Sequence, residues 1–449
     1  MLDWEKLDLK NAHSPKIIFS VYSTTTLKMA GGLMQLVAYG AQDVYLTGNP
    51  EVTFFQAKYK RHTNFAMENI EQTVNGTASS SGRVSVTVAR NGDLVGDMYV
   101  QLKAPSTIGV VSANGGAISN EWLAERAIAS AELSIGGQRV DKHYQKWWRL
   151  YSELYLDSAK KSTWGKMTTT IADGDMFLPL IFFFNRNPGL ALPLIALQYH
   201  EVRLDFDLSS EFGIYTDNST FKVWANYIYL DTEERRRFAQ KGHEYLIEQV
   251  QHTGADTLTQ NQTKQVRLSY NHPVKELVWC ASESDASNCA MWNFTTDVDA
   301  IASTSVANLD LAASKTHDEF STQGAPKLLA GAGATATAFD EETVGPLDTV
   351  KLVLNGQDRF KEQKSKYFNQ VQSYQHHSGS PMPGVYSYSF ALKPEEHQPT
   401  GTCNFSRIDN AQVAIKARNQ STNLTLNMFA VNYNVLRIQS GMGGLAFSN

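Results

Sequence analysis

Cysteine is scarce in this sequence. The 449 residues include three cysteines, Cys280, Cys289 and Cys403, and an odd number always leaves one unpaired. This count excludes the disulfide framework that stabilises many small secreted domains. A reducing compartment therefore fits the chain better than the extracellular space.

An excess of positive charge is also missing. Lys and Arg number 40 against 45 Asp and Glu, which gives a formal net charge of −5 at pH 7. Binding to phosphates requires a concentrated positive face. Two local basic clusters, Lys58–His62 and Arg235–Arg237, fit either contact with an acidic partner or a solvent-exposed run of charge, and the second interpretation is favoured. We therefore expect no direct nucleic-acid partner.

Long apolar runs are few. Residues 1–28 contain only the short run Ile17-Ile18-Phe19, which is a poor core for a signal peptide. The most apolar stretch, Met176 to Tyr199, contains three prolines and is interrupted in the middle by Asn185-Arg186-Asn187. This pattern predicts two buried strands, Phe177–Phe184 and Leu190–Leu197, joined by a polar turn, and no membrane span.

Motifs of known enzyme classes are missing as well. The chain has no Gly-x-Ser-x-Gly elbow, no phosphate-binding loop and no His-Glu-x-x-His zinc motif, because His200-Glu201 lacks the second histidine. His376 and His377 could bind a metal ion together with His397, but a solvated turn is the favoured interpretation. We therefore expect no enzyme, no catalytic residue, no cofactor and no metal.

Alternating apolar and polar residues recur along the whole sequence. Val84, Val86 and Val88 alternate with small or polar residues, and the same spacing recurs over residues 204–208 and 386–392. This period of two is typical of antiparallel sheets with one buried face. One convincing helix, from about Tyr144 to Tyr155, carries an aromatic stripe that we expect to face a core.

The two halves of the chain resemble each other. Asn226-Tyr227 and Asn432-Tyr433 are 206 residues apart (432 − 226), and three further weak echoes occur in the same order. The sequence separation between matching residues of the two halves increases between the first and second echo, so the second half contains an insertion there. Residues 281–345 are rich in Ala, Ser, Thr and Gly, and we expect this insertion to be a long surface loop. The pattern indicates two β-sandwiches of one kind, although it does not distinguish a jelly roll from other sandwich topologies.

Long blocks of the sequence closely resemble the major capsid proteins of algal large DNA viruses, the chloroviruses and their relatives. The resemblance runs from residue 29 to the C-terminus, and its clearest blocks are Met29–Asp43, Leu46–Pro50, Gly136–Tyr144, Pro188–Val202, Gly401–Asn410 and Asn432–Leu445. Blocks of this length make the match far more specific than a short motif.

The resemblance implies an all-β chain of two tandem eight-stranded jelly rolls, with short helices and long loops. It implies a homotrimer with a pseudo-sixfold outline, a pseudo-hexameric capsomer that tiles an icosahedral shell beside neighbouring capsomers and minor capsid proteins. An internal viral membrane would lie only nearby, and assembly would take place in the cytoplasm of the infected host cell. Surface glycans are also implied, and the candidate positions are Asn293, Asn419 and Asn423.

The resemblance also divides the chain. Residues 1–28 precede the usual family start and are expected to be an extension outside the mature subunit. Residues 29–240 are expected to form the first jelly roll, and residues 241–449 the second, with the outward-facing loop 281–345.

A carbohydrate-processing or carbohydrate-binding β-sandwich protein is the alternative. An enzyme of this kind would need a cleft with paired carboxylates, which sequence alone cannot exclude. A secreted lectin-like module is disfavoured, since it would be expected to carry a signal peptide.

Overall fold

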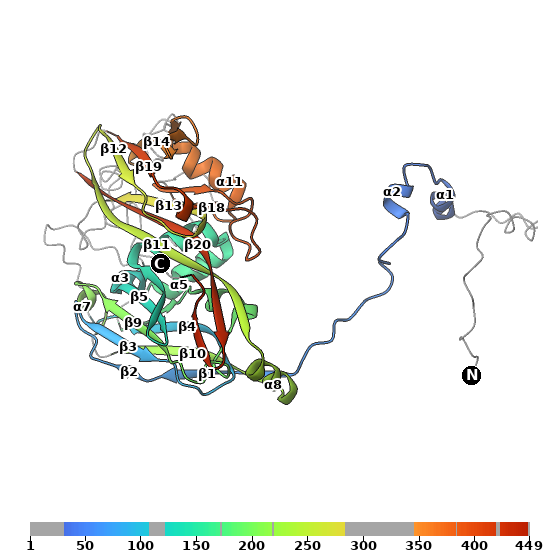
Figure 1. Cartoon of the computed structure of the whole chain (residues 1–449), viewed down its shortest axis with the longest axis horizontal. Helices are drawn as coiled ribbons and strands as arrows, with labels where there is room; N and C mark the ends of the chain where they lie inside the picture. The colour runs from blue at the N-terminus through green and yellow to red at the C-terminus, as the bar shows by residue number, and fades with distance from the viewer. Residues whose placement is uncertain are drawn as a thin grey trace, which may run out of the picture. The chain divides into compact units, whose positions relative to one another are not determined.

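The computed structural model describes residues 31–106, 122–170, 173–217, 220–282, 345–382, 384–418 and 423–447 (Figure 1). Residues 1–28, most of the 281–345 loop, Asn293 and Asn419 lie outside the described residues. The chain divides into two compact units, one ending at His62 and the other beginning at Thr63.

The first unit has little regular structure. Its two short helices are α1 (Gly31–Val37) and α2 (Val44–Thr47). From Gly32 to His62 no residue is buried, and the large apolar side chains of Tyr45 and Phe55 are 92% and 99% exposed. This stretch therefore has no hydrophobic core of its own.

Two antiparallel sheets form the first sandwich of the second unit. One sheet has the order β1 (Phe65–Gln72), β10 (Phe221–Leu230), β4 (Leu94–Lys103) and β7 (Asp175–Pro179), with β8 (Leu192–Pro193) also beside β4. The other has the order β2 (Val74–Asn75), β3 (Arg83–Thr87), β9 (Val202–Leu208), β5 (Ile128–Ile135) and β6 (Gln138–Tyr144).

The second sandwich repeats this plan. One sheet has the order β11 (His243–Leu258), β20 (Leu424–Gln439), β13 (Pro273–Ser282) and β17 (Val385–Ser389), flanked by β18 (Cys403–Asn404) and β21 (Met442–Leu445). The other has the order β12 (Thr263–Arg267), β19 (Ala411–Ala417), β14 (Leu347–Leu354) and β15 (Gln357–Asp358), with β16 (Gln363–Lys364) also beside β14.

The strand order is the same in both sandwiches. With β2, β8, β16, β18 and β21 set aside, eight strands remain in each half, the two-residue β15 among them, and they can be counted in chain order. In each half one sheet then contains the first, eighth, third and sixth strands, and the other the second, seventh, fourth and fifth. Two such sheets packed face to face form a jelly roll. The predicted fold, two tandem eight-stranded jelly rolls, is confirmed.

Short helices connect the strands. The predicted aromatic helix is α4 (Gln145–Tyr155), confirmed to within one residue. The sequence analysis missed α5 (Ser158–Thr168), where the Asp157 carboxylate caps the helix by accepting a bond from the Lys160 amide at 2.8 Å. It also missed α8 (Thr232–Gln240). The other helical segments are α3 (Leu123–Ala127), α6 (Phe183–Arg186), η1 (Pro188–Leu190), α7 (Phe212–Tyr215), η5 (Tyr367–Val371), α11 (Gln372–His376) and η6 (Phe405–Arg407).

The prediction of two long strands within residues 176–199 is wrong in detail. Only β7 and the two-residue β8 are extended, and the helical turns α6 and η1 lie between them. Phe183 and Phe184 are buried as expected, but Phe177 lies on the outer face of its sheet and is only partly buried. Three prolines and the polar residues between them prevent continuous ladder pairing here.

Candidate assembly site: the joint between the two jelly rolls

The sheet β11–β20–β13–β17 is buried on both faces. Leu277 and Trp279 of β13 point into the core of the second jelly roll, whereas Val278 and Cys280 between them belong to the core of the first. Side chains alternate across a strand, so a sheet with two apolar faces needs a cover on each. The first jelly roll supplies the second cover.

Helix α4 forms much of that cover. The Trp147 ring centroid lies 5.6 Å from that of Phe429 on β20, and Tyr144, just before the helix, lies 4.8 Å from His252 on β11. Further along, the ring centroids of Tyr155 and His377 lie 5.4 Å apart in a T-shaped arrangement. The aromatic stripe expected to face a core therefore faces the joint between the jelly rolls.

A charged cluster crosses the same joint. The Glu248 carboxylate of β11 lies 2.9 Å from the Arg186 guanidinium, contributed by the first jelly roll, and 2.8 Å from the Lys275 ammonium of β13. Burial by itself would raise the pKa of Glu248, but the two cations hold it below its usual value. Burial lowers the pKa of Lys275 to about 8, against the opposing effect of Glu248.

His377 lies in the second part of this cluster. Its Nε2 atom is 3.2 Å from a Glu276 oxygen, and its Nδ1 atom is 3.3 Å from a Glu395 oxygen. Burial opposes the imidazolium, but the two carboxylates outweigh it and raise the pKa of His377 to about 9. The favoured interpretation of residues 376–377 as a solvated turn is therefore wrong for His377, because two distant segments bring glutamates to it.

The stability of the joint should depend on pH through His377. Since its pKa in the folded chain lies above the ordinary value of 6.5, folding favours the protonated ring. Its contribution is complete below pH 6.5 and is lost as the pH rises through about 9. We expect the melting temperature of wild type to exceed that of His377→Gln at pH 6, and the difference to shrink toward pH 10. A difference in melting temperature that does not change with pH would contradict this prediction. Lys275 also titrates in this range, but it is present in both proteins, so the comparison removes most of its contribution.

The other histidines and basic residues singled out in the sequence are dispersed. The Nδ1 atom of His376 contacts the Leu392 carbonyl at 3.0 Å, and that of His200 contacts the Gly443 carbonyl at 2.8 Å. Lys58–His62 are exposed, as are Arg235–Arg237 on α8, where Arg235 pairs with Asp93 at 3.0 Å. Within the described ranges no group of three potential metal ligands occurs.

The glycosylation candidates are resolved only in part. Asn423 is exposed directly before β20, and Asn293 and Asn419 lie outside the described residues.

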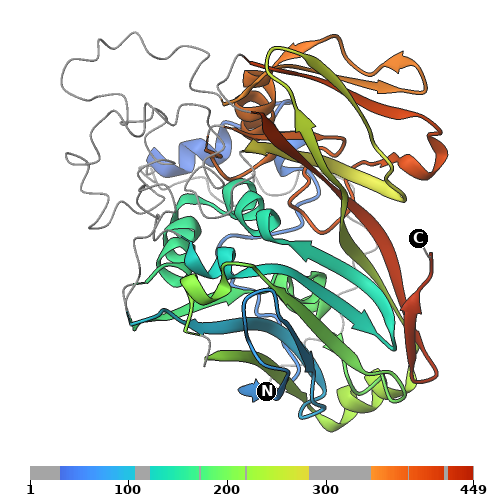
Figure 2. The same cartoon turned by 90° about the vertical axis from the view of Figure 1, so that its left-hand side faces the viewer.

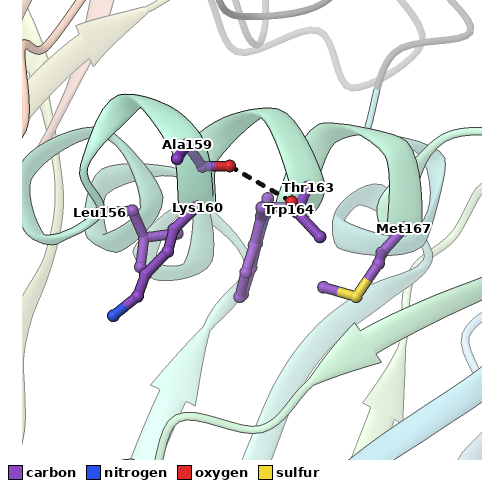
Figure 3. Close-up of a pocket in the computed structure, with 6 residues that line it drawn as sticks. All are labelled: Leu156, Ala159, Lys160, Thr163, Trp164 and Met167. Carbon is purple, nitrogen blue, oxygen red and sulfur yellow. Dashed lines mark hydrogen bonds between the residues drawn. The ribbon is translucent and has the colours of Figure 1, made fainter.

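A shallow apolar hollow of about 370 Å³ lies on α5 (Figure 3). It is lined by Leu156, Ala159, Lys160, Thr163, Trp164 and Met167. The Thr163 hydroxyl donates to the Ala159 carbonyl at 3.2 Å within the helix. Lys160 and the Thr163 hydroxyl, which is bonded within the helix, do not form a pair of nucleophile and base. The hollow is therefore better suited to binding an apolar side chain than to catalysis.

None of the helices within the described part of the chain is long and apolar enough to cross a membrane.

Two family models cover most of the chain. One, described as large eukaryotic DNA virus major capsid protein, matches residues 234–444. The other, described as major capsid protein N-terminus, matches residues 53–231.

Curated relatives and solved structures agree with these matches. The major capsid protein of Paramecium bursaria Chlorella virus 1 is 45% identical, with 94% of this chain and all of the relative covered. That of Phaeocystis pouchetii virus is 42% identical over the same shares. A subunit of the PBCV-1 virus capsid superposes with a TM-score of 0.71 and 38% identity over 88% of this chain and 100% of that one. The Faustovirus major capsid protein, at 12% identity, shares the fold with a TM-score of 0.64 over 91% of this chain and 96% of its own.

The family models, the curated relatives and the repeated jelly-roll topology lead to one conclusion: this chain belongs to the family of major capsid proteins of large eukaryotic DNA viruses.

Proposed function

We propose that three copies of this capsid protein assemble into a pseudo-hexameric capsomer, the unit that tiles the viral shell. The observation that carries the proposal is the strand order, which occurs twice in one chain. Two similar jelly rolls per chain give three copies six near-equivalent flanks. One polypeptide can then occupy a hexagonal lattice through closed, symmetric contacts.

The joint supports this role by fixing the distance and angle between the jelly rolls. It is apolar over α4 and β20, and it carries paired charges at Glu248 and His377. A lattice requires every subunit to have the same shape, and packed interiors deform little. We infer a structural role without catalysis.

The expected oligomer is directly measurable. Light scattering on the soluble protein should give three times the chain mass of 49.9 kDa. Obligate interfaces of this kind bury roughly 2,000 Å² or more, so the trimer should persist at micromolar concentration. A monodisperse, folded monomer under these conditions would contradict the proposal.

Other features of the subunit are proposed on the family resemblance. The division into jelly rolls at residues 240–241 is supported by the two family models, which meet between residues 231 and 234. Limited proteolysis should cleave within the expected surface loop 281–345 and at this boundary before it cleaves within the strands of either jelly roll. Contacts with minor capsid proteins, assembly in the host cytoplasm and the absence of residues 1–28 from the mature subunit are further proposals. Crosslinking mass spectrometry of virions tests the first, electron microscopy of sectioned infected cells the second, and a search for peptides of residues 1–28 in purified virions the third.

Glycans are proposed on the outward surface, at Asn423 and in the segments that contain Asn293 and Asn419. The exposure of Asn423 supports the first of these positions. Glycopeptide mapping of virions that finds all three asparagines unmodified would remove this proposal.

A further inference from the structure

Helix α4 has a counterpart in the second jelly roll. Helix α4 follows the fifth main strand of the first jelly roll and precedes the sixth, and η5 with α11 occupies the same place in the second. Tyr144 and Tyr367 are 223 residues apart (367 − 144), and Tyr151 and Tyr374 have the same separation (374 − 151). The two segments are therefore equivalent in topology and share the spacing of two tyrosines.

The counterpart has an exposed apolar side. Val371 is 40% exposed and Tyr374 is 90% exposed, with exposed Gln370 and Gln375 beside them. In the first jelly roll the equivalent tyrosine, Tyr151, lies in the joint, where it stacks on Tyr155 at 4.8 Å. Thus the second jelly roll presents to solvent the segment that the first uses to hold a neighbouring sheet.

The sheet β11–β20–β13–β17, which α4 covers, also has a counterpart, the sheet β1–β10–β4–β7 of the first jelly roll. Helix α4 covers the outer face of the sheet made of the first, eighth, third and sixth strands of the second jelly roll. The same face in the first jelly roll carries partly exposed aromatic side chains. Tyr99 stacks on Trp224 with centroids 6.5 Å apart and meets the edge of Phe177 at 5.8 Å, and the Trp224 indole donates to Gln101 at 2.8 Å.

We propose that α11 of one chain packs through Tyr374 and Val371 on the outer face of the sheet β1–β10–β4–β7 of the next chain, against Trp224, Tyr99 and Phe177. This inference rests on the proposed trimer and names its seam. It repeats between chains the contact that α4 makes within one chain.

The positions of the two surfaces point to a second copy as the partner. Within one chain the two surfaces cannot meet, because α11 and the strands β1 and β10 lie at opposite ends of the 63–449 unit (Figures 1 and 2). The charges around the surfaces do not oppose this contact, since the outer face of the sheet carries Asp97 and Asp175 together with Lys103 and Lys222, and Lys366 is exposed beside η5. A head-to-tail contact of this type forms a closed ring when the rotations between successive chains add up to a full turn. In the proposed trimer three chains, each with two jelly rolls, complete that ring.

Photo-crosslinking tests the seam directly. A benzoylphenylalanine placed at Tyr374 of the full-length protein should crosslink to one or more of the tryptic segments 91–103, 167–186 and 223–235, which contain Tyr99, Phe177 and Trp224. The same probe at Gln265, which is exposed on β12 of the second jelly roll, is the matched control and should not reach these segments. Crosslinks from residue 374 to other segments only would overturn the proposal.

Dissociation of the oligomer provides a second readout. Tyr374→Ala and Trp224→Ala should each raise the subunit dissociation constant by roughly tenfold or more, as expected for a buried aromatic anchor. The double variant should lose less than the sum of both changes, because the residues contact each other. Circular dichroism identifies any variant that fails to fold, and crosslinking then decides alone.

The outcomes separate the seam from the trimer itself. A monomeric wild-type protein would refute the proposed function. A wild-type trimer that both variants leave unchanged, with no crosslink to segments 91–103, 167–186 or 223–235, would refute only this seam.

Discussion

Replacing Phe183 with aspartate is expected to abolish folding of the chain. Phe183 is 1% exposed in the core of the first jelly roll, where its ring meets that of Phe184 edge to face at 5.4 Å. An unpaired carboxylate in such a place costs several kcal/mol, which is comparable with the total stability of about 5–15 kcal/mol of many proteins. The variant should be insoluble or lack a cooperative thermal transition followed by circular dichroism.

The matched control for this experiment is Phe447→Asp. Phe447 is 60% exposed near the C-terminus, so the same substitution there removes little buried area. The control should remain folded and melt close to wild type. If Phe183→Asp also folds with a melting temperature near that of wild type, the placement of this side chain in the core is wrong.

Truncating Glu248 to alanine should lower the free energy of unfolding by about 3–5 kcal/mol, the usual result of removing one partner from a buried ion pair. The substitution leaves the Lys275 side chain, which is 1% exposed, and the Arg186 side chain, which is 23% exposed, without their shared carboxylate. Denaturant unfolding at a fixed protein concentration measures the change, since assembly contributes to apparent stability.

Glu244 on the same strand provides the control. Its carboxylate lies 2.8 Å from Arg437, but both side chains are more than half exposed. Exposed pairs of this kind contribute about 0–1 kcal/mol. Glu244→Ala should therefore have little effect, and equal losses from the two substitutions would argue against a special role for the joint. Replacing Arg186 and Lys275 by methionine together with Glu248→Ala should recover part of the loss, because no charge then remains unpaired.

The stability of the joint matters for function because it holds the two jelly rolls in place. A capsid subunit must hold two jelly rolls in one fixed relation, and here an apolar sheet face and a buried charge cluster do so together. The apolar contacts supply most of the free energy, whereas paired charges make alternative arrangements costly because each would leave a charge unpaired. Glu248→Ala should therefore loosen the geometry that a lattice requires.

Local patterns in the sequence were sufficient for several sandwich strands and for the aromatic helix. Val84 and Val86 lie in β3 with buried side chains, and residues 204–208 lie in β9, where Asp205 is buried as well as its apolar neighbours. The alternation over residues 386–392 holds less well, because β17 ends at Ser389 and Leu392 is 74% exposed. The aromatic stripe of residues 144–155 became α4. These predictions succeeded because the period of two or 3.6 residues reports directly which side chains share a face. The capsid family followed from long blocks of resemblance, which carry far more information than periodicity.

Only the tertiary structure decided what each buried face contacts. Sequence alone did not reveal that β13 is covered on one face by its own jelly roll and on the other by the neighbouring one. Nor did it place His377 between Glu276 and Glu395, which come from segments far apart in the chain. Periodicity describes which residues share a side of one element, whereas burial, ion pairing and pKa depend on which distant element covers that side. That information arises only when the chain is folded.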